Sequence, residues 1–350
     1  MSIPTFSPMK FHPFKSVDES EFEVGDIKFQ TRNATSKSTL KGMAVFCKFY
    51  LTEHEFEHDL AIARQLYDHE AFVRTLAVCE KKVEFRTIIM EMAEEDLFGA
   101  LHESEIRCYN IRNLQFQIVS AVEFMHQRGL IHRDLKTDNI LLFNNRTRIK
   151  ICDYGSVASE DRKLTSNIHF SDSYVPPEFL LDATSVMASD IWSLGCIFFQ
   201  MRCGKAVFNV KQKLADVEYL FGTPSEIKWP DFHRVIKQPR SSNCCSPQLV
   251  SISFAICGLN IREGELLSRM FRMFPGDRIT AKQILKHDYF SQDEKEDGKL
   301  DCQGLNKFWE YNKFVMDPDY DKRNSQVVFA FTDDPVLMKF RSQYFGKAHS

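Results

Sequence analysis

The sequence predicts an α+β fold with two lobes, a small β-rich lobe that contains one helix and a larger lobe that is mainly helical. Short runs rich in β-branched and aromatic residues occupy much of residues 22–92 and are typical of strands. Among them, the segment 53–70 has the apolar spacing of a helix. From about residue 109 helical spacing dominates, and a chain of 350 residues is long enough for a second lobe.

The chain is expected to begin with an N-terminal arm at residues 1–21, which prolines interrupt and which show no hydrophobic period. The small lobe then spans about 22–93. Its four predicted strands cover 22–31, 43–51, 72–80 and 84–92. The helix between the second and third strands is predicted from an apolar stripe formed by Phe56, Leu60, Ala63 and Leu66.

The larger lobe is expected to span about 97–290. Its first helix is predicted to start after a cap at Asn110 and to end before Gly129. The apolar stripe of this helix comprises Ile111, Leu114, Ile118, Val122 and Met125. A second helix is predicted to start at a Ser189 cap and to stop at Gly204. Apolar residues occupy almost the whole circumference of this helix, which indicates a buried central position.

Two segments are predicted to lie outside this regular framework. The segment 235–262 is rich in Ser, Asn and Cys, which favours a loop or insert. Residues 291–350 open with a charged run and then regain aromatic side chains. We expect them to form a C-terminal extension that is partly packed on the body.

The composition is that of a soluble globular protein, with 43% hydrophobic and 27% charged residues. A formal net charge of -3 gives no electrostatic reason to expect a nucleic-acid partner. The 10 cysteines form no CxxC pair and are expected to be reduced thiols of an intracellular protein, in the cytoplasm and/or the nucleus. No run approaches the roughly 18 apolar residues of a membrane span, so no membrane partner is expected.

The stretch IHRDLKTDNILLFN at 131–144 places polar groups of different chemistry in one turn between apolar runs. Asp134, Lys136 and Asn139 suit phosphoryl transfer, in which an acceptor orients a hydroxyl, a cation balances charge and an amide oxygen binds Mg²⁺. Asp153 follows at the end of the strand-like run RIKIC and is the candidate for a second metal ligand.

These motifs resemble those of the eukaryotic protein kinases. HRDLKTDN is similar to the catalytic loop HRDLxxxN of that family, while DYG at 153–155 and VPPE at 175–178 stand at the positions of its DFG and APE motifs. The run SDIWSLG and the run FPGDRITAKQILKHDYF extend the resemblance over roughly 20–290. The similarity implies a bilobal protein-kinase-like fold and a protein kinase domain at 22–290.

The resemblance also implies pairings that hold the larger lobe together. Asp190 is expected to accept hydrogen bonds from the catalytic-loop backbone, and Arg278 is expected to pair with Glu178. The run LFGTPSEIKWPDF at 220–232 resembles the corresponding stretch of cyclin-dependent and related kinases.

By the same resemblance the protein is an ATP- and Mg²⁺-dependent Ser/Thr protein kinase. Asp134 corresponds to the catalytic base, and Lys136 corresponds to a γ-phosphate contact that is typical of Ser/Thr specificity. Asn139 and Asp153 correspond to the Mg²⁺ ligands. Lys48, at the end of AVFCK, stands where the family has the lysine of VAIK that orients ATP.

Further nucleotide contacts follow from the same alignment: Met92 as a hinge backbone donor, Asp96 at the ribose and Leu141 below the adenine. Met90 corresponds to the gatekeeper residue, although a core methionine is the simpler interpretation of it alone. The acidic partner of Lys48 stays open between Asp59, which helical phase favours, and Glu57.

The small lobe departs from the family pattern in two places. The segment 23–31 offers only Gly25 where the family has GxGxxG, and Asp26 adds a negative charge beside the expected phosphates. Phe46 replaces the small alanine above the adenine. These departures favour an alternative function, a pseudokinase that acts as a scaffold or allosteric module with weak or no ATP turnover.

Under both interpretations, kinase and pseudokinase, the predicted partners are proteins: protein substrates and an activating or scaffolding protein. Ser166 stands where cyclin-dependent kinases carry an activating phosphothreonine, and it is equally well interpreted as a solvated loop serine. Arg133 is available for such a phosphate, whereas Ala158 replaces an arginine of the family's cluster. Val175 likewise replaces the arginine of WYRAPE, on which proline-directed substrate choice depends.

Overall fold

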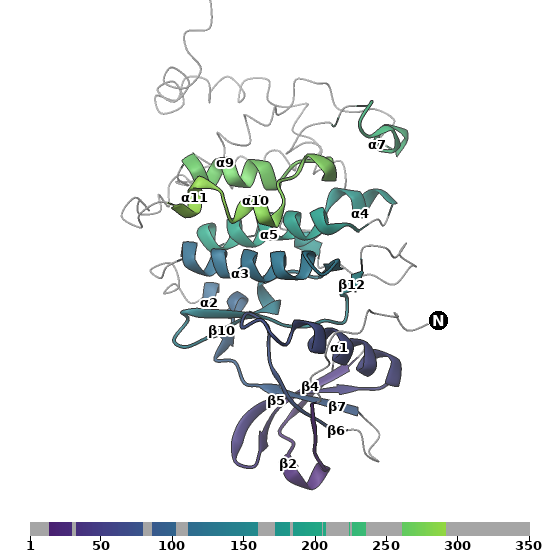
Figure 1. The fold of residues 1–350 in the computed structure, drawn as a ribbon, viewed down its shortest axis with the longest axis vertical. Helices are drawn as coiled ribbons and strands as arrows, with labels where there is room; N and C mark the ends of the chain where they lie inside the picture. The colour runs from purple at the N-terminus through teal and green to yellow at the C-terminus, as the bar shows by residue number, and fades with distance from the viewer. Residues whose placement is uncertain are drawn as a thin grey trace, which may run out of the picture.

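The computed structural model describes residues 14–29, 33–79, 86–102, 111–159, 172–182, 185–204, 206–207, 224, 226–235 and 261–291. Figure 1 shows a twisted sheet with one helix at one end of the molecule and layers of helices stacked away from it. The predicted α+β fold, with a small β-rich lobe and a larger, mainly helical lobe, is confirmed.

The small lobe is built on one sheet with the strand order β1-β6-β7-β5-β4-β2, and β3 also pairs with β4. The strands are β1 (Lys15–Ser16), β2 (Phe22–Glu23), β3 (Ile27–Phe29), β4 (Asn33–Leu40), β5 (Met43–Tyr50), β6 (Thr75–Cys79) and β7 (Arg86–Glu91). The sequence predicts β5, β6 and β7, and it predicts one strand at 22–31 where the structure has the two strands β2 and β3; β1 and β4 are not predicted. The strand β4 lacks an apolar period because it buries Ser36 and Ser38, whose hydroxyls hydrogen-bond to each other at 3.2 Å.

The last part of the predicted N-terminal arm belongs to the small lobe. The strand β1 pairs in parallel with β6, and the side chain of Val17 is buried against the sheet. The ring of Phe14 lies edge-on to Tyr67, with 5.9 Å between the ring centroids. The predicted arm at 1–21 therefore extends too far, because Val17 gains burial when this segment pairs with the edge of β6.

The one helix of the small lobe, α1 (Glu53–Leu66), packs against β5 and β7. Its N-terminus is capped by Thr52, whose hydroxyl accepts a hydrogen bond from the backbone N–H of Glu55 at 3.3 Å. All members of the predicted apolar stripe are buried: Phe56, Leu60, Ala63 and Leu66. The predicted helix and its buried stripe are confirmed, although the helix ends at Leu66 and not near residue 70.

Short strands and a 3-10 turn frame the loops of the larger lobe that face the small lobe. They are β8 (Glu95–Asp96), β9 (Leu130–Ile131), η3 (Thr137–Asn139), β10 (Ile140–Phe143), β11 (Arg148–Ile151) and β12 (Ala158–Ser159). The strand β10 lies between β8 and β11, and β12 pairs with β9. These pairings bring the loop 132–139 beside the segment that follows β11.

The described helices of the larger lobe are α2 (Leu97–His102), α3 (Ile111–His126), α4 (Pro177–Asp182), α5 (Met187–Cys203), α7 (Pro230–Val235), α9 (Ile261–Met270), α10 (Ala281–Ile284) and α11 (Asp288–Ser291). The whole predicted stripe of α3 is buried. Gly129 follows this helix with a φ of 69°, a conformation that glycine adopts without strain. The predicted cap at Asn110 lies outside the described residues.

The helix α5 is the predicted buried central helix, and every side chain from 189 to 203 is buried. Gly204 ends it in the left-handed conformation, as expected. The predicted start is wrong, because Val186 occupies the cap position and Ser189 lies three residues further on. The Ser189 hydroxyl nevertheless accepts a hydrogen bond from the backbone N–H of Val186 at 3.0 Å.

Part of the organisation predicted for the end of the chain is not described. The predicted loop or insert at 235–262 and the predicted C-terminal extension at 291–350 lie almost wholly outside the described residues. Among the helices that are described, none has the length and apolar character needed to cross a membrane.

Candidate active site

The loop between β9 and η3 is held by a buried carboxylate from α5. Asp190 accepts hydrogen bonds from the backbone N–H groups of His132, at 2.8 Å, and Arg133, at 2.9 Å. His126 lies 2.9 Å from the same carboxylate. Burial alone would raise the pKa of Asp190, but the hydrogen bonds from His126 and the loop backbone outweigh it and hold that pKa below its usual range. This loop geometry therefore depends on a charged Asp190.

Three of the predicted catalytic side chains meet within this loop. The Lys136 ammonium lies 2.8 Å from Oδ2 of Asp134. Asn139 donates from Nδ2 to the backbone oxygen of Asp134 at 2.7 Å and to its Oδ2 at 3.2 Å. The Asp134 carboxylate thus lies beside a cation and an amide, which hold it in place as an acceptor.

The fourth predicted catalytic residue, Asp153, follows β11 and is joined to the same loop. The backbone N–H of Cys152 donates to the backbone oxygen of Asn139 at 3.0 Å. Asp153 itself has a φ of 63°, an uncommon value for a non-glycine residue that is found at functional turns. Its Oδ1 accepts a hydrogen bond from Nζ of Lys48 at 2.8 Å.

Charge balance keeps Asp153 ionised in this position. Burial alone would raise the pKa of Asp153, but the neighbouring Lys48 ammonium outweighs it and lowers that pKa below the ordinary value. An ionised carboxylate and an amide oxygen are the ligand types that Mg²⁺ prefers. Asp153 and Asn139 therefore suit a hard cation that completes its coordination with phosphate oxygens and water.

The structure favours one of the two candidate acidic partners of Lys48. Nζ of Lys48 lies 2.9 Å from Oδ2 of Asp59, which is buried on α1, whereas Glu57 points to the exposed side of the helix. Burial alone would lower the pKa of Lys48, but Asp59 outweighs it and raises that pKa well above its usual value. Lys48 thus links α1 of the small lobe to Asp153 of the larger lobe.

The predicted nucleotide contacts of the connecting segment lie next to one another. Leu141 of β10 is the register partner of Asp96 in β8. The Asp96 carboxylate also accepts a hydrogen bond from the backbone N–H of Gly99 at 2.7 Å, at the start of α2. Met92 follows directly after β7 and is half-buried. The roles of Met92, Asp96 and Leu141 in nucleotide binding remain predictions.

Phe46 lies on the face of β5 that carries Lys48. Alternate residues of a strand point to the same side, so Phe46, Lys48 and Tyr50 share a face. Met90 of β7 is the register partner of Phe46. The Phe46 ring is therefore directed to the side of the sheet where the resemblance places adenine, and it is half-buried there.

Gly25 lies between β2 and β3, where the chain crosses close to β4. A Cβ atom at Gly25 would come 2.1 Å from the backbone oxygen of Lys37. The described structure thus explains this glycine by sheet packing. Residues 30–32, between β3 and β4, lie outside the described residues.

The supporting pairs expected from the resemblance are present. Arg278 forms a buried ion pair with Glu178, with 2.6 Å between Nη2 and Oε2. Ser189 donates to the other oxygen of Glu178 at 2.7 Å. Arg133 donates from Nε to the backbone oxygen of Ser156, so its side chain has a partner within the large lobe. Ser166, the expected phosphosite, lies outside the described residues.

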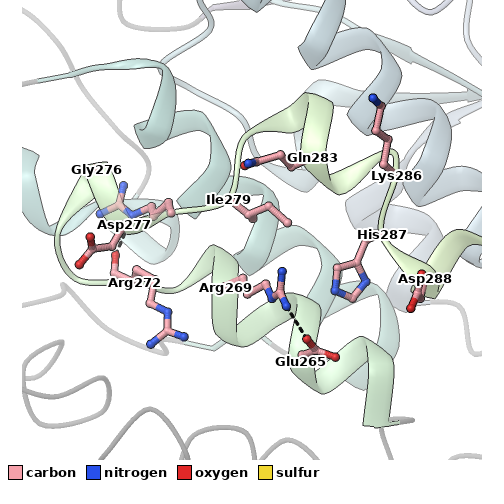
Figure 2. Close-up of a pocket in the computed structure, with 11 residues that line it drawn as sticks. Glu265, Arg269, Arg272, Gly276, Asp277, Ile279, Gln283, Lys286, His287 and Asp288 are labelled. Atoms are coloured by element: carbon pink, nitrogen blue, oxygen red, sulfur yellow. Dashed lines mark hydrogen bonds and ion pairs between the residues drawn. The ribbon is translucent and has the colours of Figure 1, made fainter.

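A hollow of about 630 Å³ lies on the opposite side of the larger lobe, between α9, η5 (Pro275–Asp277), α10 and α11 (Figure 2). Both basic and acidic side chains line it. Arg269 forms an ion pair with Glu265 (Figure 2), and Arg278 forms an ion pair with the buried Glu178. Figure 1 shows this group of helices separated from the small lobe by α3 and α5. The hollow is therefore not part of the candidate active site.

One residue of the site has no counterpart in the sequence-based prediction. The hydroxyl of Tyr50 donates to Oδ2 of Asp59 at 2.7 Å, on the atom that also accepts from Lys48. The period of two along β5 places Tyr50 on the same face as Lys48. In the sequence, this spacing is the signal that could have identified Tyr50 as a residue of the site.

Comparison with known proteins agrees with this geometry. A family model described as the protein kinase domain matches residues 31–290. Cyclin-dependent kinase 15 of Mus musculus is 30% identical over 217 residues, which cover 59% of this chain and 49% of that protein. Cyclin-dependent kinase G1 of Arabidopsis thaliana is 27% identical over 319 residues, which cover 83% of this chain and 50% of that protein. The chain spans about half the length of these curated relatives.

A solved structure shares the fold. The structure of the CAK complex from Chaetomium thermophilum bound to ATP-gamma-S matches with a TM-score of 0.66 and 21% sequence identity. The match covers 78% of this chain and 92% of that chain. At this identity the likeness concerns the fold alone.

Proposed function

This chain belongs to the protein kinase family, and from that premise we propose that it transfers the γ-phosphoryl group of ATP to Ser or Thr hydroxyls of protein substrates. The observation that carries the proposal is the contact between Lys48 and Asp153, at 2.8 Å. It joins the lysine of the small lobe to the segment after β11, which is bonded through the backbone of Cys152 to the loop that holds Asp134 and Asn139. Side chains that phosphoryl transfer requires, namely those of Lys48, Asp134, Lys136, Asn139 and Asp153, are thus linked to one another through contacts of the two lobes.

In this proposal each side chain has one task. Asp134 accepts the proton of the attacking hydroxyl, and Lys136, 2.8 Å from it, balances charge on the transferred group. Asn139 and Asp153 would hold Mg²⁺, which would supply positive charge to balance that of the phosphates. Lys48 orients the nucleotide, and Asp59 fixes the position of its ammonium.

The remaining nucleotide contacts and the domain limits belong to the same proposal. Met92, Asp96 and Leu141 bind the adenosine part of ATP, and the protein kinase domain spans 22–290. An activating or scaffolding protein, such as a cyclin-like subunit, is a proposed partner because the chain resembles cyclin-dependent kinases. We place the protein inside the cell, in the cytoplasm or the nucleus, where ATP is available.

A pseudokinase is the second candidate, and specific observations favour it. Phe46 lies on the face of β5 that carries Lys48, and the close approach of Gly25 to the backbone of Lys37 accounts for this glycine by sheet packing. In this alternative the chain keeps the kinase fold and acts as a scaffold or allosteric module. In that case Asp134, Lys136, Asn139 and Asp153 would be present in the larger lobe although the protein turns over no ATP.

Transfer of label from radioactive ATP to generic protein substrates tests the proposal. The wild type is expected to label Ser and Thr residues, and Asp134→Asn is expected to reduce the rate by roughly 100- to 10,000-fold because the base is lost. Asp138→Asn is the matched control, since Asp138 is an exposed acid of the same loop. Label transfer that is equal in Asp134→Asn and the wild type would contradict the assignment of the base.

A further inference from the structure

The side chain of Tyr50 connects three groups at the junction of β5 and α1. It is 3% exposed, and its hydroxyl donates to Oδ2 of Asp59 at 2.7 Å. Its ring lies edge-on to Phe56 of α1, with 5.7 Å between centroids. The Lys48 ammonium lies over the same ring, 5.3 Å from its centroid. Tyr50 therefore contacts both members of the Lys48–Asp59 pair and the helix that carries Asp59.

The acid on α1 is shorter than the one that the kinase family uses to pair with this lysine. Glutamate has one more methylene group, so Asp59 has less reach toward Lys48. The distance of 2.9 Å between Lys48 and Asp59 is nevertheless that of a direct ion pair. A shorter acid requires a further contact that keeps its carboxylate close to β5. The Tyr50 hydroxyl supplies such a contact, because it bonds to the same oxygen of Asp59 as Lys48 does.

The surroundings keep Tyr50 in the protonated form that donates this hydrogen bond. Burial, followed by the nearby charge of Asp59, raises the pKa of Tyr50 well above its ordinary value. The hydroxyl is thus a permanent donor at neutral pH. A buried carboxylate with two donors on one oxygen has little freedom to rotate away from Lys48.

We propose that Tyr50 is a positioning residue, whose hydroxyl fixes Asp59 and so holds α1 and Lys48 in the geometry that places the ammonium against Asp153. The consequence for catalysis rests on the proposed kinase function, whereas the consequence for α1 does not. Without the hydroxyl, Asp59 keeps one donor and can turn away, and Lys48 then pairs with Asp153 alone.

Amide hydrogen exchange of the full chain without nucleotide tests the structural part of the proposal. Tyr50→Phe keeps the ring and removes the hydroxyl, and it is expected to speed exchange in α1, residues 53–66, by roughly 10- to 100-fold. Tyr289→Phe is the matched control: it removes another buried hydroxyl, which donates to Gln115 at 2.6 Å in the larger lobe. Unchanged exchange in Tyr50→Phe, or an equal increase in both variants, would overturn the proposal.

A rescue variant separates positioning from a general loss of packing. In the double variant, Tyr50→Phe removes the hydroxyl and Asp59→Glu lengthens the acid by one methylene group. The longer acid can reach Lys48 without a hydrogen bond from residue 50. We expect the double variant to bring α1 exchange back to within about threefold of the wild-type rate, an outcome that a loss of packing alone does not give. A double variant that exchanges as fast as Tyr50→Phe would contradict the proposed role.

Binding of Mg·ATP by calorimetry extends the test to the nucleotide. Tyr50→Phe is expected to weaken binding about tenfold, and the double variant is expected to recover most of it. Faster α1 exchange in Tyr50→Phe together with a wild type that transfers no phosphate would support the positioning role and reject the proposed function. Wild-type affinity in Tyr50→Phe would overturn the link between Tyr50 and Lys48.

Discussion

The two lobes hold their parts of the candidate site by different means. In the larger lobe, Asp190 and Asn139 bond to backbone atoms of the loop that carries Asp134. In the small lobe, the Lys48 ammonium is bonded to side chains, namely to Asp59, which also accepts from the Tyr50 hydroxyl, and to Asp153 of the larger lobe. A side chain anchored to buried backbone moves only when the lobe unfolds, whereas a pair of side chains on two elements can separate while both persist.

Because of this difference, substitutions in the two lobes are expected to have different effects. Changes to the network of the larger lobe are expected to lower the free energy of unfolding, because they leave buried charges or backbone groups without partners. Changes to the small lobe are expected to alter nucleotide affinity or the position of α1 at a smaller cost in stability. The following substitutions test this contrast, in order of expected effect.

The largest effect is expected for Arg278→Met, which leaves Glu178 buried without its cation. The free energy of unfolding should fall by about 3–5 kcal/mol, as measured by denaturant titration. The double variant Arg278→Met with Glu178→Met should be more stable than Arg278→Met, because no buried charge remains. A loss below about 1 kcal/mol in the single variant would show that this pair does not anchor the larger lobe.

Asp190→Asn is expected to cost about 2–3 kcal/mol by weakening the bonds to two loop N–H groups. The lowered pKa of Asp190 also predicts a pH dependence. The carboxylate stabilises the fold above its unfolded-state pKa of about 4, and this contribution is lost as pH falls through the lower pKa of the folded state.

Denaturant titrations at a series of pH values check this prediction. The difference in stability between wild type and Asp190→Asn should be constant near neutral pH and shrink below about pH 4. A difference that grows as the pH falls has the wrong sign for a carboxyl group with a lowered pKa.

Gly25→Ala is expected to cost about 2 kcal/mol, because the new methyl group would meet the backbone oxygen of Lys37 at 2.1 Å and shift the strand. Hydrogen exchange should rise in β2, β3 and β4 but not in α5. Val24→Ala is the control, since Val24 is 46% exposed and should change stability by less than about 0.5 kcal/mol. Equal stability of Gly25→Ala and the wild type would mean that the close approach of the chains is not required.

Phe14→Ala is expected to cost about 1.5 kcal/mol, since the half-buried ring contacts Tyr67 and lies under Arg64. The loss should appear in thermal unfolding and as faster exchange at the end of α1. Lys15→Ala, at an exposed neighbour, is the control. If both variants behave alike, the N-terminal segment does not support α1.

The elements with a clear hydrophobic period could be predicted from the sequence. The stripe of α1 and the all-round apolar helix α5 signal burial directly, because each is encoded by residues near one another in the chain. The strand β4 could not be predicted in this way, since its buried face carries serines that bond to each other. The pairing of β1 with β6 depends on a strand about sixty residues away, which local periodicity does not report.

The same distinction applies to the candidate site. Asp134, Lys136 and Asn139 follow from one compact motif and Asp153 from a second, and the structure brings them together with Lys48. The choice of Asp59 over Glu57 required the orientation of α1 relative to β5. The role of Tyr50 also depends on the contact between β5 and α1, which the sequence does not report. Its spacing of two residues from Lys48 on the strand nevertheless indicates that both side chains lie on one face.

The most direct test of the whole account is the affinity for Mg·ATP of the wild type and of Phe46→Ala. We expect the larger lobe to supply its polar groups in full and the small lobe to limit nucleotide binding through Phe46, on the Lys48 face of β5. Calorimetry should show binding by both proteins, about tenfold tighter in Phe46→Ala, since relief of overpacking is worth about 1.4 kcal/mol. Absence of binding by both proteins at millimolar ATP would contradict the account and favour the pseudokinase.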